Sequence, residues 1–477
     1  EDRVQQMWTS QKTSDSKKTG YGLGWRLGQR SGRKVVWHTG GQAGTSTVFL
    51  LVPETGTSVA LMCNLQNTRL LELASSIVDV IQPPKKVDYS DAIEKVKQAV
   101  KFEVEQKQLP AFSISLVDND RVVWADGFGF QDAKQSTPAK ADTVYRVGSV
   151  SKLFTDIAVM QLVENGKLDL DAPIQKYLPA FAPKNPFDIS LTLRQMMSHR
   201  SGLVRESPVG HYFDPDEPTL AATVESLNDT TLVYKPETKT KYSNAAIAVV
   251  GAVLESQLET SHPEWVRQKI LAPLNMNGSS FVVSPAVREN LATGWMRTYD
   301  GRRFEAPGFL LGTGPAGNMY SSVQDLSKFL MCLFNQGATA KGRIMSARTF
   351  RQMTTPIKGM DGKPQGFGIG FHIEQLDGHT KIGHGGAVYG FSSQLEALPE
   401  RRLGVAAVSS LDGSNGVVGR LADYALRLML ATQDGKPLPS YRTTGPVPPD
   451  RAKELVGTFK EVDGDRFTRI TELNGEV

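Results

Sequence analysis

Ser149 and Lys152 stand three residues apart in this 477-residue chain, a spacing at which a lysine amine could activate a serine hydroxyl. They stand in Arg146-Val-Gly-Ser-Val-Ser-Lys152, just before an apolar run from Leu153 to Leu162. Residues at i and i+3 share one face of a helix, so the lysine ammonium is expected beside the serine hydroxyl. A serine is a weak nucleophile until a base removes its proton. A lysine can be that base only if burial and nearby cations lower its pKa to roughly 7 or 8, and the apolar run would supply the burial.

The spacing alone is weak evidence, because residues 14–17 repeat the Ser-x-x-Lys pattern in a polar stretch with no apolar run behind it. There, a capping serine and a solvated lysine are the ordinary interpretation. Two further motifs change the interpretation of Ser149. Tyr242-Ser-Asn244 follows it after 93 residues and is the only Tyr-x-Asn among twelve tyrosines, and His384-Gly-Gly386 follows after another 142. Each motif alone is more typical of a packed tyrosine or a glycine turn, but all three in this order favour a catalytic site.

Other kinds of site find little support in the sequence. Ser149 lacks the Gly-x-Ser-x-Gly pattern of α/β-hydrolases. The seven histidines show no metal-binding spacing, and the Gly-x-Gly-x-Gly segments at 20–24 and 366–370 open strands rather than helices, so we expect neither a metal nor a nucleotide cofactor. Acidic and basic residues alternate at a net charge of +4, which argues against a nucleic-acid partner. No apolar run reaches about 18 residues, so no transmembrane segment is expected.

A segment of the chain is repeated. When the sequence is shifted by 346 positions, residues 1 to about 80 lie on 347 to about 426 without a gap, for example Gly20–Trp25 on Gly366–Phe371. Self-similarity at one fixed offset marks a repeated structural unit, and an offset this long indicates domains in series. The first copy has nothing equivalent to Ser149, so the chemistry is expected in the second copy.

The second copy is predicted to be one complete domain over residues 89–432, of the α/β class. A hairpin over about 112–124 comes early, a largely helical section runs from about 150 to 345, and strands return from 366 to 410 before a closing helix. Early and late strands separated by helices indicate one antiparallel sheet flanked by helices, assembled from both ends of the domain, with a helical lobe beside it.

The segments outside this domain are predicted to be a domain fragment, two linkers and the start of a small β domain. Residues 1–81 read as the C-terminal fragment of a preceding copy, which either packs on a neighbour through unpaired strand edges, allowing self-association, or is partly disordered. The other expected segments are a linker at 82–88, a second linker at 433–450, and the start of a truncated small β domain at 451–477. The chain begins inside a domain pattern without a signal peptide, so we expect a piece of a longer product whose compartment the sequence does not fix. Cys63 and Cys332 are expected to be buried, inert thiols.

With these motifs the chain resembles the penicillin-recognising serine hydrolases, nearest to the class C β-lactamases and the related serine esterases and D-alanyl-D-alanine carboxypeptidases. Residues 191–203 and 314–322 add to the resemblance. It covers 89–432 in full and 1–81 in part, and it implies the β-lactamase/transpeptidase-like fold with a site between the two lobes.

The resemblance also implies roles for the motif residues. Ser149 would be the acylated nucleophile and Lys152 its proton partner. Tyr242 would move a proton between Ser149 and the leaving group or activate the deacylating water. Lys152 would keep Tyr242 anionic or ready to give up its proton. Asn244 would hold Lys152 and the substrate amide by hydrogen bonds.

The third motif departs from the pattern of many true β-lactamases. Its strand, with Gly385 and Gly386, would lie along the substrate. The backbone N–H of Ala387 would join that of Ser149 as an oxyanion hole. Each such donor stabilises the transition state by roughly 3 kcal/mol. His384 stands where those enzymes carry a lysine, and it is mostly neutral at pH 7. Ala387 also removes a hydroxyl. Both changes argue against penicillins as preferred substrates.

The sequence therefore predicts a serine acyl hydrolase acting on an ester, amide or β-lactam of modest size, a small molecule or a peptide. A D-amino-acid-specific peptidase is the first alternative. A non-catalytic assembly scaffold, like the filament-forming mitochondrial members of this superfamily, is the second.

Overall fold

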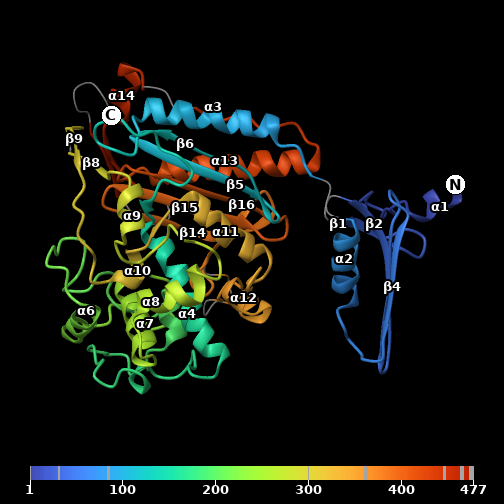
Figure 1. Ribbon diagram of the computed structural model, residues 1–477, viewed down its shortest axis with the longest axis horizontal. Helices are drawn as coiled ribbons and strands as arrows, with labels where there is room; N and C mark the ends of the chain where they lie inside the picture. The colour runs from blue at the N-terminus through green and yellow to red at the C-terminus, as the bar shows by residue number, and fades with distance from the viewer. Residues whose placement is uncertain are drawn as a thin grey trace. The chain divides into compact units, whose positions relative to one another are not determined.

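The computed structural model describes residues 2–30, 33–82, 86–298, 300–358, 362, 364, 366–443, 447–461 and 467–471. It divides into two compact units, which are treated separately below (Figure 1). The smaller unit contains residues 1–88 with 432–436, and the larger unit contains residues 89–431 with 437–477.

The larger unit is built on a six-stranded antiparallel sheet in the order β13-β14-β15-β16-β5-β6. β16 pairs with β5 from Leu403–Asp118 to Ser409–Phe112, so the two ends of the domain meet inside one sheet, as the sequence predicted. The strands are β5 Ala111–Asp118, β6 Arg121–Gly129, β13 His372–Leu376, β14 His379–Val388, β15 Phe391–Leu398 and β16 Leu403–Ser409.

Helices cover both faces of this sheet. α3 (Ser90–Gln106) and α13 (Asn415–Asp434) are linked by an ion pair of 2.9 Å between Arg420 and Glu103, and α11 (Val323–Phe334) packs against β5 and β16 (Figure 1). The alternation of serine with apolar residues in β5 is typical of a strand with one solvent face, yet all eight residues are buried.

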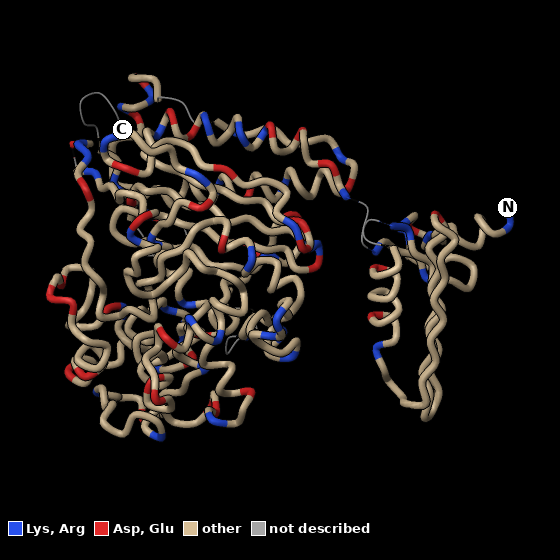
Figure 2. Tube along the Cα trace, in the orientation of Figure 1, with Lys and Arg blue, Asp and Glu red and all other residues tan. Residues whose placement is uncertain are grey.

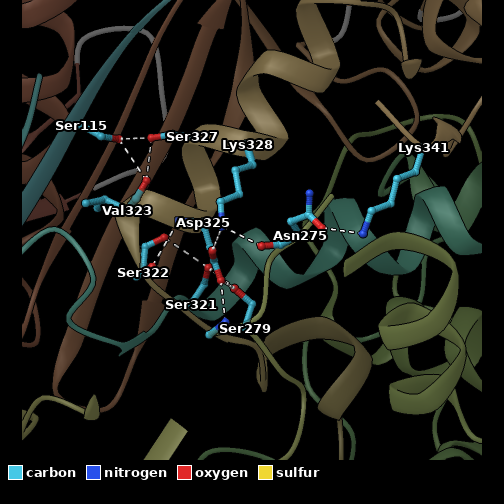
Figure 3. Close-up of polar contacts among 11 residues, drawn as sticks. Ser115, Asn275, Ser279, Ser321, Ser322, Val323, Asp325, Ser327, Lys328 and Lys341 are labelled. Carbon is cyan, nitrogen blue, oxygen red and sulfur yellow. Dashed lines mark hydrogen bonds and ion pairs between the residues drawn. The ribbon is translucent and has the colours of Figure 1, made fainter. Parts of the chain in front are cut away.

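The α11 layer explains this burial. The hydroxyls of Ser115 and Ser327 lie 2.8 Å apart, and both lie within 3.2 Å of the Val323 carbonyl oxygen (Figure 3). At the start of the same helix, Asp325 accepts hydrogen bonds from Gly278 N and Ser279 Oγ, both at 2.9 Å. These buried polar contacts tie the helical lobe to the sheet.

The helical lobe is centred on α4 (Ser151–Glu164) and α7 (Asn244–Ser256), both buried along most of their length. α4 contains the predicted apolar run and ends at Asn165, before Gly166 with φ +69°. The other α-helices of the lobe and its surroundings are α5 Leu193–Met197, α6 Leu220–Glu225, α8 His262–Val266, α9 Pro285–Asn290, α10 Gly314–Gly317 and α12 Ala347–Met353.

The smaller unit repeats one part of the larger unit. Its sheet has the order β1-β2-β3-β4, with β1 Arg26–Arg30, β2 Arg33–Gln42, β3 Thr45–Val52 and β4 Thr57–Cys63, joined by α1 (Asp2–Met7) and α2 (Leu70–Ile81). Adding 346 to the strand bounds gives the bounds of β13, β14, β15 and β16. The pairing registers agree too, since Arg26–Trp37 corresponds to His372–Gly383.

The C-terminal segment and the cysteines differ from expectation in part. α14 (Pro449–Leu455) is a helix at the start of the segment that was expected to begin a small β domain, and β17 (Gly457–Lys460) pairs with β18 (Phe467–Ile470) as an antiparallel hairpin. Residues 462–466 and 472–477 of the expected β domain lie outside the described residues. Cys332 is buried, but Cys63 is partly exposed, which corrects the expectation for that thiol.

Charged residues of both signs are interspersed along each unit (Figure 2). Among the helices of the described ranges, none has the length and apolarity that a membrane crossing would require.

Candidate active site

Ser149 lies in the single turn Gly148–Val150 that leads directly into α4. One helical turn further on, Lys152 donates a hydrogen bond of 3.0 Å from Nζ to Ser149 Oγ. Both side chains are buried. By contrast, the Ser-x-x-Lys pattern at 14–17 lies in an exposed loop, as its polar surroundings indicated.

The Lys152 amine is held by three acceptors. Besides Ser149 Oγ, it donates to Asn244 Oδ1 and to the carbonyl oxygen of Ala316, both at 2.8 Å. Burial lowers the pKa of Lys152 to about 7, while the carboxyl groups of Glu206 and Asp156 oppose this shift. At neutral pH a large fraction of the amine is therefore uncharged. In that form it can donate to only two of the three oxygens, and its lone pair can accept the proton of Ser149 Oγ, as a general base must.

Asn244 connects the lysine to a carboxyl group that the motifs did not reveal. Asn244 is the first residue of α7, and its Nδ2 donates to Glu206 Oε1 at 2.7 Å while its Oδ1 accepts from Lys152. Burial raises the pKa of Glu206. The amide group of Asn244 is thus oriented by two partners. Only one of its two N–H groups is used by Glu206, and Asn244 also lines the open cleft.

The Tyr242 ring is enclosed by cationic and aromatic groups. Its centroid lies 4.7 Å from Lys152 Nζ, 5.4 Å from Arg205 Cζ and 4.3 Å from the ring of His199. Its hydroxyl is buried and has no well-formed hydrogen bond to any described residue, although the Ser149 hydroxyl lies near enough to lower the pKa of Tyr242. Burial dominates and raises this pKa above the ordinary value. Tyr242 is therefore a neutral phenol at rest and can donate a proton.

His384 lies on β14 and is also neutral. Burial lowers the pKa of His384 to about 3, and Lys152 adds to the shift. Nδ1 lies 2.5 Å from the Gly385 carbonyl oxygen and must donate to it, so the lone pair of the ring is on Nε2. Nε2 is buried and has no hydrogen-bond partner in the described part of the chain.

Two glycines allow β14 to lie directly against the Ser149 turn. A Cβ on Gly386 would collide with the Val147 carbonyl oxygen and Ser393 Oγ, and a Cβ on Gly148 would lie 2.8 Å from Ala387 N. Gly148 also has φ +52°, which disfavours a side chain. Gly385 is less constrained, because a Cβ there would meet the end of the Gln394 side chain at 2.8 Å.

One open cleft of about 460 Å³ brings most of the predicted residues together. Lys152 lies behind Ser149 and is not part of the cleft surface. The cleft is lined by Ser149, Arg205, Tyr212, Tyr242, Asn244, His384, Gly385, Gly386, Ala387, Val388, Tyr389, Asp412 and Asn415.

Several residues of this site were missed from the sequence. Arg205 and Glu206 come from the segment between α5 and α6, which carries no spacing signal at these positions, and His199 lies in the stretch 191–203 that supported the resemblance but was given no role. Asp156 could have been noticed, because it is a carboxylate one turn after Lys152 in a largely apolar helix. It is fully buried, neither carboxyl oxygen has a hydrogen-bond partner among the described residues, and burial raises its pKa well above the usual value. Burial thus favours the neutral form of Asp156, and the nearby Lys152 opposes this.

Two curated relatives are each 28% identical to the chain. The human protein "Putative beta-lactamase-like 1" aligns over 77% of this chain and 74% of its own length. "Beta-lactamase-like protein 2" of Dictyostelium discoideum aligns over 68% of this chain. The aligned part is 61% of the Dictyostelium protein, so the chain spans less than two thirds of that relative.

Solved structures share the fold. The octameric penicillin-binding protein homologue from Pyrococcus abyssi superposes with a TM-score of 0.65 at 28% identity, covering 77% of this chain and 82% of its own. A D-amino acid amidase from Ochrobactrum anthropi SV3 reaches 0.61 at 21% identity and covers 72% and 99%. EstCE1, a hydrolase with promiscuous acyltransferase activity, reaches 0.61 at 20% and covers 71% and 99%.

The family model named Beta-lactamase matches residues 2–80 and 94–429. These matches confirm the resemblance and the α/β fold predicted from the motifs. The chain belongs to the beta-lactamase family.

Proposed function

We propose that the larger unit is a serine acyl hydrolase that cleaves an ester or amide of modest size through an acyl-enzyme on Ser149. One observation carries the proposal: Lys152 Nζ lies 3.0 Å from Ser149 Oγ and has its pKa lowered to about 7 by burial. Membership of a family whose solved structures include a D-amino acid amidase and the hydrolase EstCE1 supports the same class of reaction.

Acylation would begin with proton transfer from Ser149 Oγ to the uncharged amine of Lys152. Ser149 Oγ then bonds to the substrate carbonyl carbon, and the carbonyl oxygen becomes an oxyanion that the backbone N–H groups of Ser149 and Ala387 would stabilise. The intermediate collapses when the bond to the leaving group breaks. Tyr242 gives the leaving group its phenolic proton and takes one from the Lys152 ammonium, which returns Lys152 to its neutral form.

Deacylation would use the same groups in the reverse direction. A water molecule loses a proton through Tyr242 to Lys152 as its oxygen bonds to the acyl carbon. The bond from Ser149 Oγ to that carbon then breaks, and the proton on Lys152 returns to the serine. Because Tyr242 is neutral at rest, it relays protons and does not act as a standing tyrosinate.

The proposal is tested by trapping the acyl-enzyme. The full chain is incubated with a p-nitrophenyl ester and with a fluorescent penicillin, and the intact mass and the labelled peptide are determined for the wild type and for Ser149→Ala. Ester turnover or a covalent adduct on Ser149, absent in Ser149→Ala, is the expected result. If neither reagent reacts, the scaffold alternative is favoured and the proposal fails.

The pH dependence follows from the protonation state of Lys152. The base form is the uncharged amine, so kcat/KM for p-nitrophenyl acetate should rise about tenfold per pH unit at low pH and level off above an apparent pKa near 7. Rates for Ser149→Ala are subtracted as background. A profile that is flat from pH 5.5 to 8 would contradict the role of Lys152.

His384 should set the preference for uncharged substrates. A neutral imidazole offers no cation to a substrate carboxylate, so His384→Lys is expected to raise the acylation rate by benzylpenicillin about tenfold relative to a neutral ester. His384→Gln is the matched neutral control and should leave the ratio unchanged. Both rates are measured at several pH values from 6.5 to 8.5, because burial at this position also lowers the pKa of an introduced lysine, whose charge the effect requires. An equal ratio in all three proteins would show that this position does not meet the carboxylate.

Asp412 favours an amino-acid amide or peptide with a free ammonium as a second candidate substrate, and the D configuration is suggested only by the similar D-amino acid amidase. Its carboxyl group lines the same cleft as Ser149 and could accept a substrate ammonium. Comparing p-nitroanilides of D-alanine and L-alanine would test this preference.

A further inference from the structure

Glu206 is a carboxyl group that the proposed reaction does not use, although it lies close to the base. Its Oε1 accepts a hydrogen bond of 2.7 Å from Asn244 Nδ2, and Asn244 Oδ1 accepts one of 2.8 Å from Lys152 Nζ. Among the described residues that line the cleft around Ser149, Asn244 is present and Glu206 is not. One side chain therefore separates this carboxyl group from the lysine amine.

The two partners of Asn244 fix which way its amide group points. A carboxylate oxygen can only accept a hydrogen bond, and a lysine ammonium can only donate. With one on each side, only the orientation with the nitrogen toward Glu206 and the oxygen toward Lys152 satisfies both. Because Asn244 also lines the cleft, this orientation sets which of its polar atoms can meet a substrate.

Partial burial strengthens the effect of the Glu206 charge on the amine. Lys152 and Asn244 are buried, and the Glu206 side chain is 26% exposed. Burial raises the pKa of Glu206, but its hydrogen bonds from Asn244 and Arg205 oppose this and favour the carboxylate. The Arg205 side chain is 68% exposed, so water screens its ion pair with Glu206 and it compensates the carboxylate only in part.

Glu206 is the nearby charge that most favours the ammonium form of Lys152. Burial lowers the pKa of Lys152 to about 7, Glu206 and then Asp156 oppose this shift, and Arg205 adds to it. The groups that face the amine from the elements around it are Asp156 on α4 itself, His199, Arg205 and Glu206 between α5 and α6, Tyr242 just before α7, and His384 on β14.

We propose that Glu206 is a positioning residue for the acyl transfer proposed above, on which this inference rests. Its hydrogen bond holds the Asn244 amide with Oδ1 toward Lys152, and its negative charge stabilises the ammonium form of Lys152. Glu206 thereby sets the pH at which Ser149 is activated and keeps that pH near neutrality, where a general base works best. It acts through Asn244 and Lys152.

Two substitutions separate the charge from the hydrogen bond. Glu206→Gln keeps an acceptor oxygen for Asn244 and removes the charge, whereas Glu206→Leu removes both. Loss of a nearby anion favours the uncharged amine, so the acid limb of kcat/KM for p-nitrophenyl acetate should move about one pH unit lower in Glu206→Gln. The ratio of kcat/KM at pH 6 to that at pH 8.5 then rises about fivefold.

Glu206→Leu should show the same shift together with a loss of activity at high pH. Its plateau should fall by about tenfold or more, because Asn244 loses the partner that orients it. Glu225→Gln and Glu225→Leu are the matched controls, since they make the same changes at an exposed carboxyl group of α6. Both controls should keep the acid limb and the plateau of the wild type.

A second measurement follows Lys152 without turnover. The full chain is produced with lysine carrying carbon-13 at Cε and titrated by NMR, and the Lys152 signal is the one missing from Lys152→Met. The pKa of Lys152 should fall in Glu206→Gln by the same amount as in the kinetic profile.

Two results would overturn the proposal. One is an acid limb and an NMR titration of Glu206→Gln that match the wild type, and the other is a wild-type plateau in Glu206→Leu. Thermal unfolding checks that both variants are folded, and the nearly isosteric Glu206→Gln remains decisive if Glu206→Leu is not. If the wild type hydrolyses no ester, the proposed function fails, and the NMR titration alone decides whether Glu206 acts on Lys152.

Discussion

Replacing Lys152 with methionine is expected to lower kcat/KM for ester hydrolysis by about 10²- to 10⁴-fold, the usual contribution of a general base. Methionine has a similar length and suits the buried position, but it cannot take the proton of Ser149. The loss should appear in kcat and in the rate of acyl-enzyme formation, measured by stopped-flow with p-nitrophenyl acetate. The acid limb near pH 7 should disappear together with the activity.

The chain offers a matched control for this change. Lys17 occupies the same place in the second Ser-x-x-Lys pattern, but its side chain is 82% exposed and pairs with Asp15 at 2.8 Å. Lys17→Met should leave kcat/KM and the pH profile unchanged. If Lys152→Met retains more than a tenth of the activity while remaining folded, another group must activate Ser149.

Replacing Gly386 with valine is the second change with a large expected effect. Its side chain would strike the Val147 carbonyl oxygen and Ser393 Oγ, so β14 must move away from the Ser149 turn. The N–H of Ala387 would then leave its place beside the developing oxyanion, and the loss of one such donor costs about 10²- to 10³-fold in kcat. Steady-state kinetics with a p-nitrophenyl ester measures this loss.

Gly385→Ala serves as the comparison. A methyl group there meets only the movable end of Gln394, so activity should fall less than about threefold. Thermal unfolding of both variants separates a local displacement from loss of the fold. Equal activities for the two variants would show that the contact between β14 and the Ser149 turn does not position an oxyanion donor.

Much of the fold could be predicted because strands and helices follow local patterns. The early hairpin, the apolar helix that contains Lys152 and the late strands could each be predicted from the periodicity of their own residues. The repeat shows the pattern of the late strands a second time, which supports their prediction. The helix over Pro449–Leu455 was missed, since its polar sequence offers no apolar stripe. The exposure of Cys63 could not be foreseen from the strand alone, because it depends on which elements cover the sheet.

The candidate site, too, could be predicted only in part from the sequence. Ser149, Tyr242 and His384 belong to motifs whose order along the chain indicates chemistry, and one cleft contains all three. Glu206 could not be found by such reasoning. It lies outside any helix or strand, and its hydrogen-bond partner Asn244 is 38 residues further along the chain. Its position is set by the tertiary fold and not by any spacing along the chain.

The pairing of β16 with β5 has a consequence for how the larger unit folds. It joins segments almost 300 residues apart, so closing it has an entropic cost that local hairpins do not bear. Contacts of such high sequence separation form slowly. During synthesis, Ser149 leaves the ribosome long before β14, the strand that faces it, so the cleft can form only when nearly the whole domain has been translated.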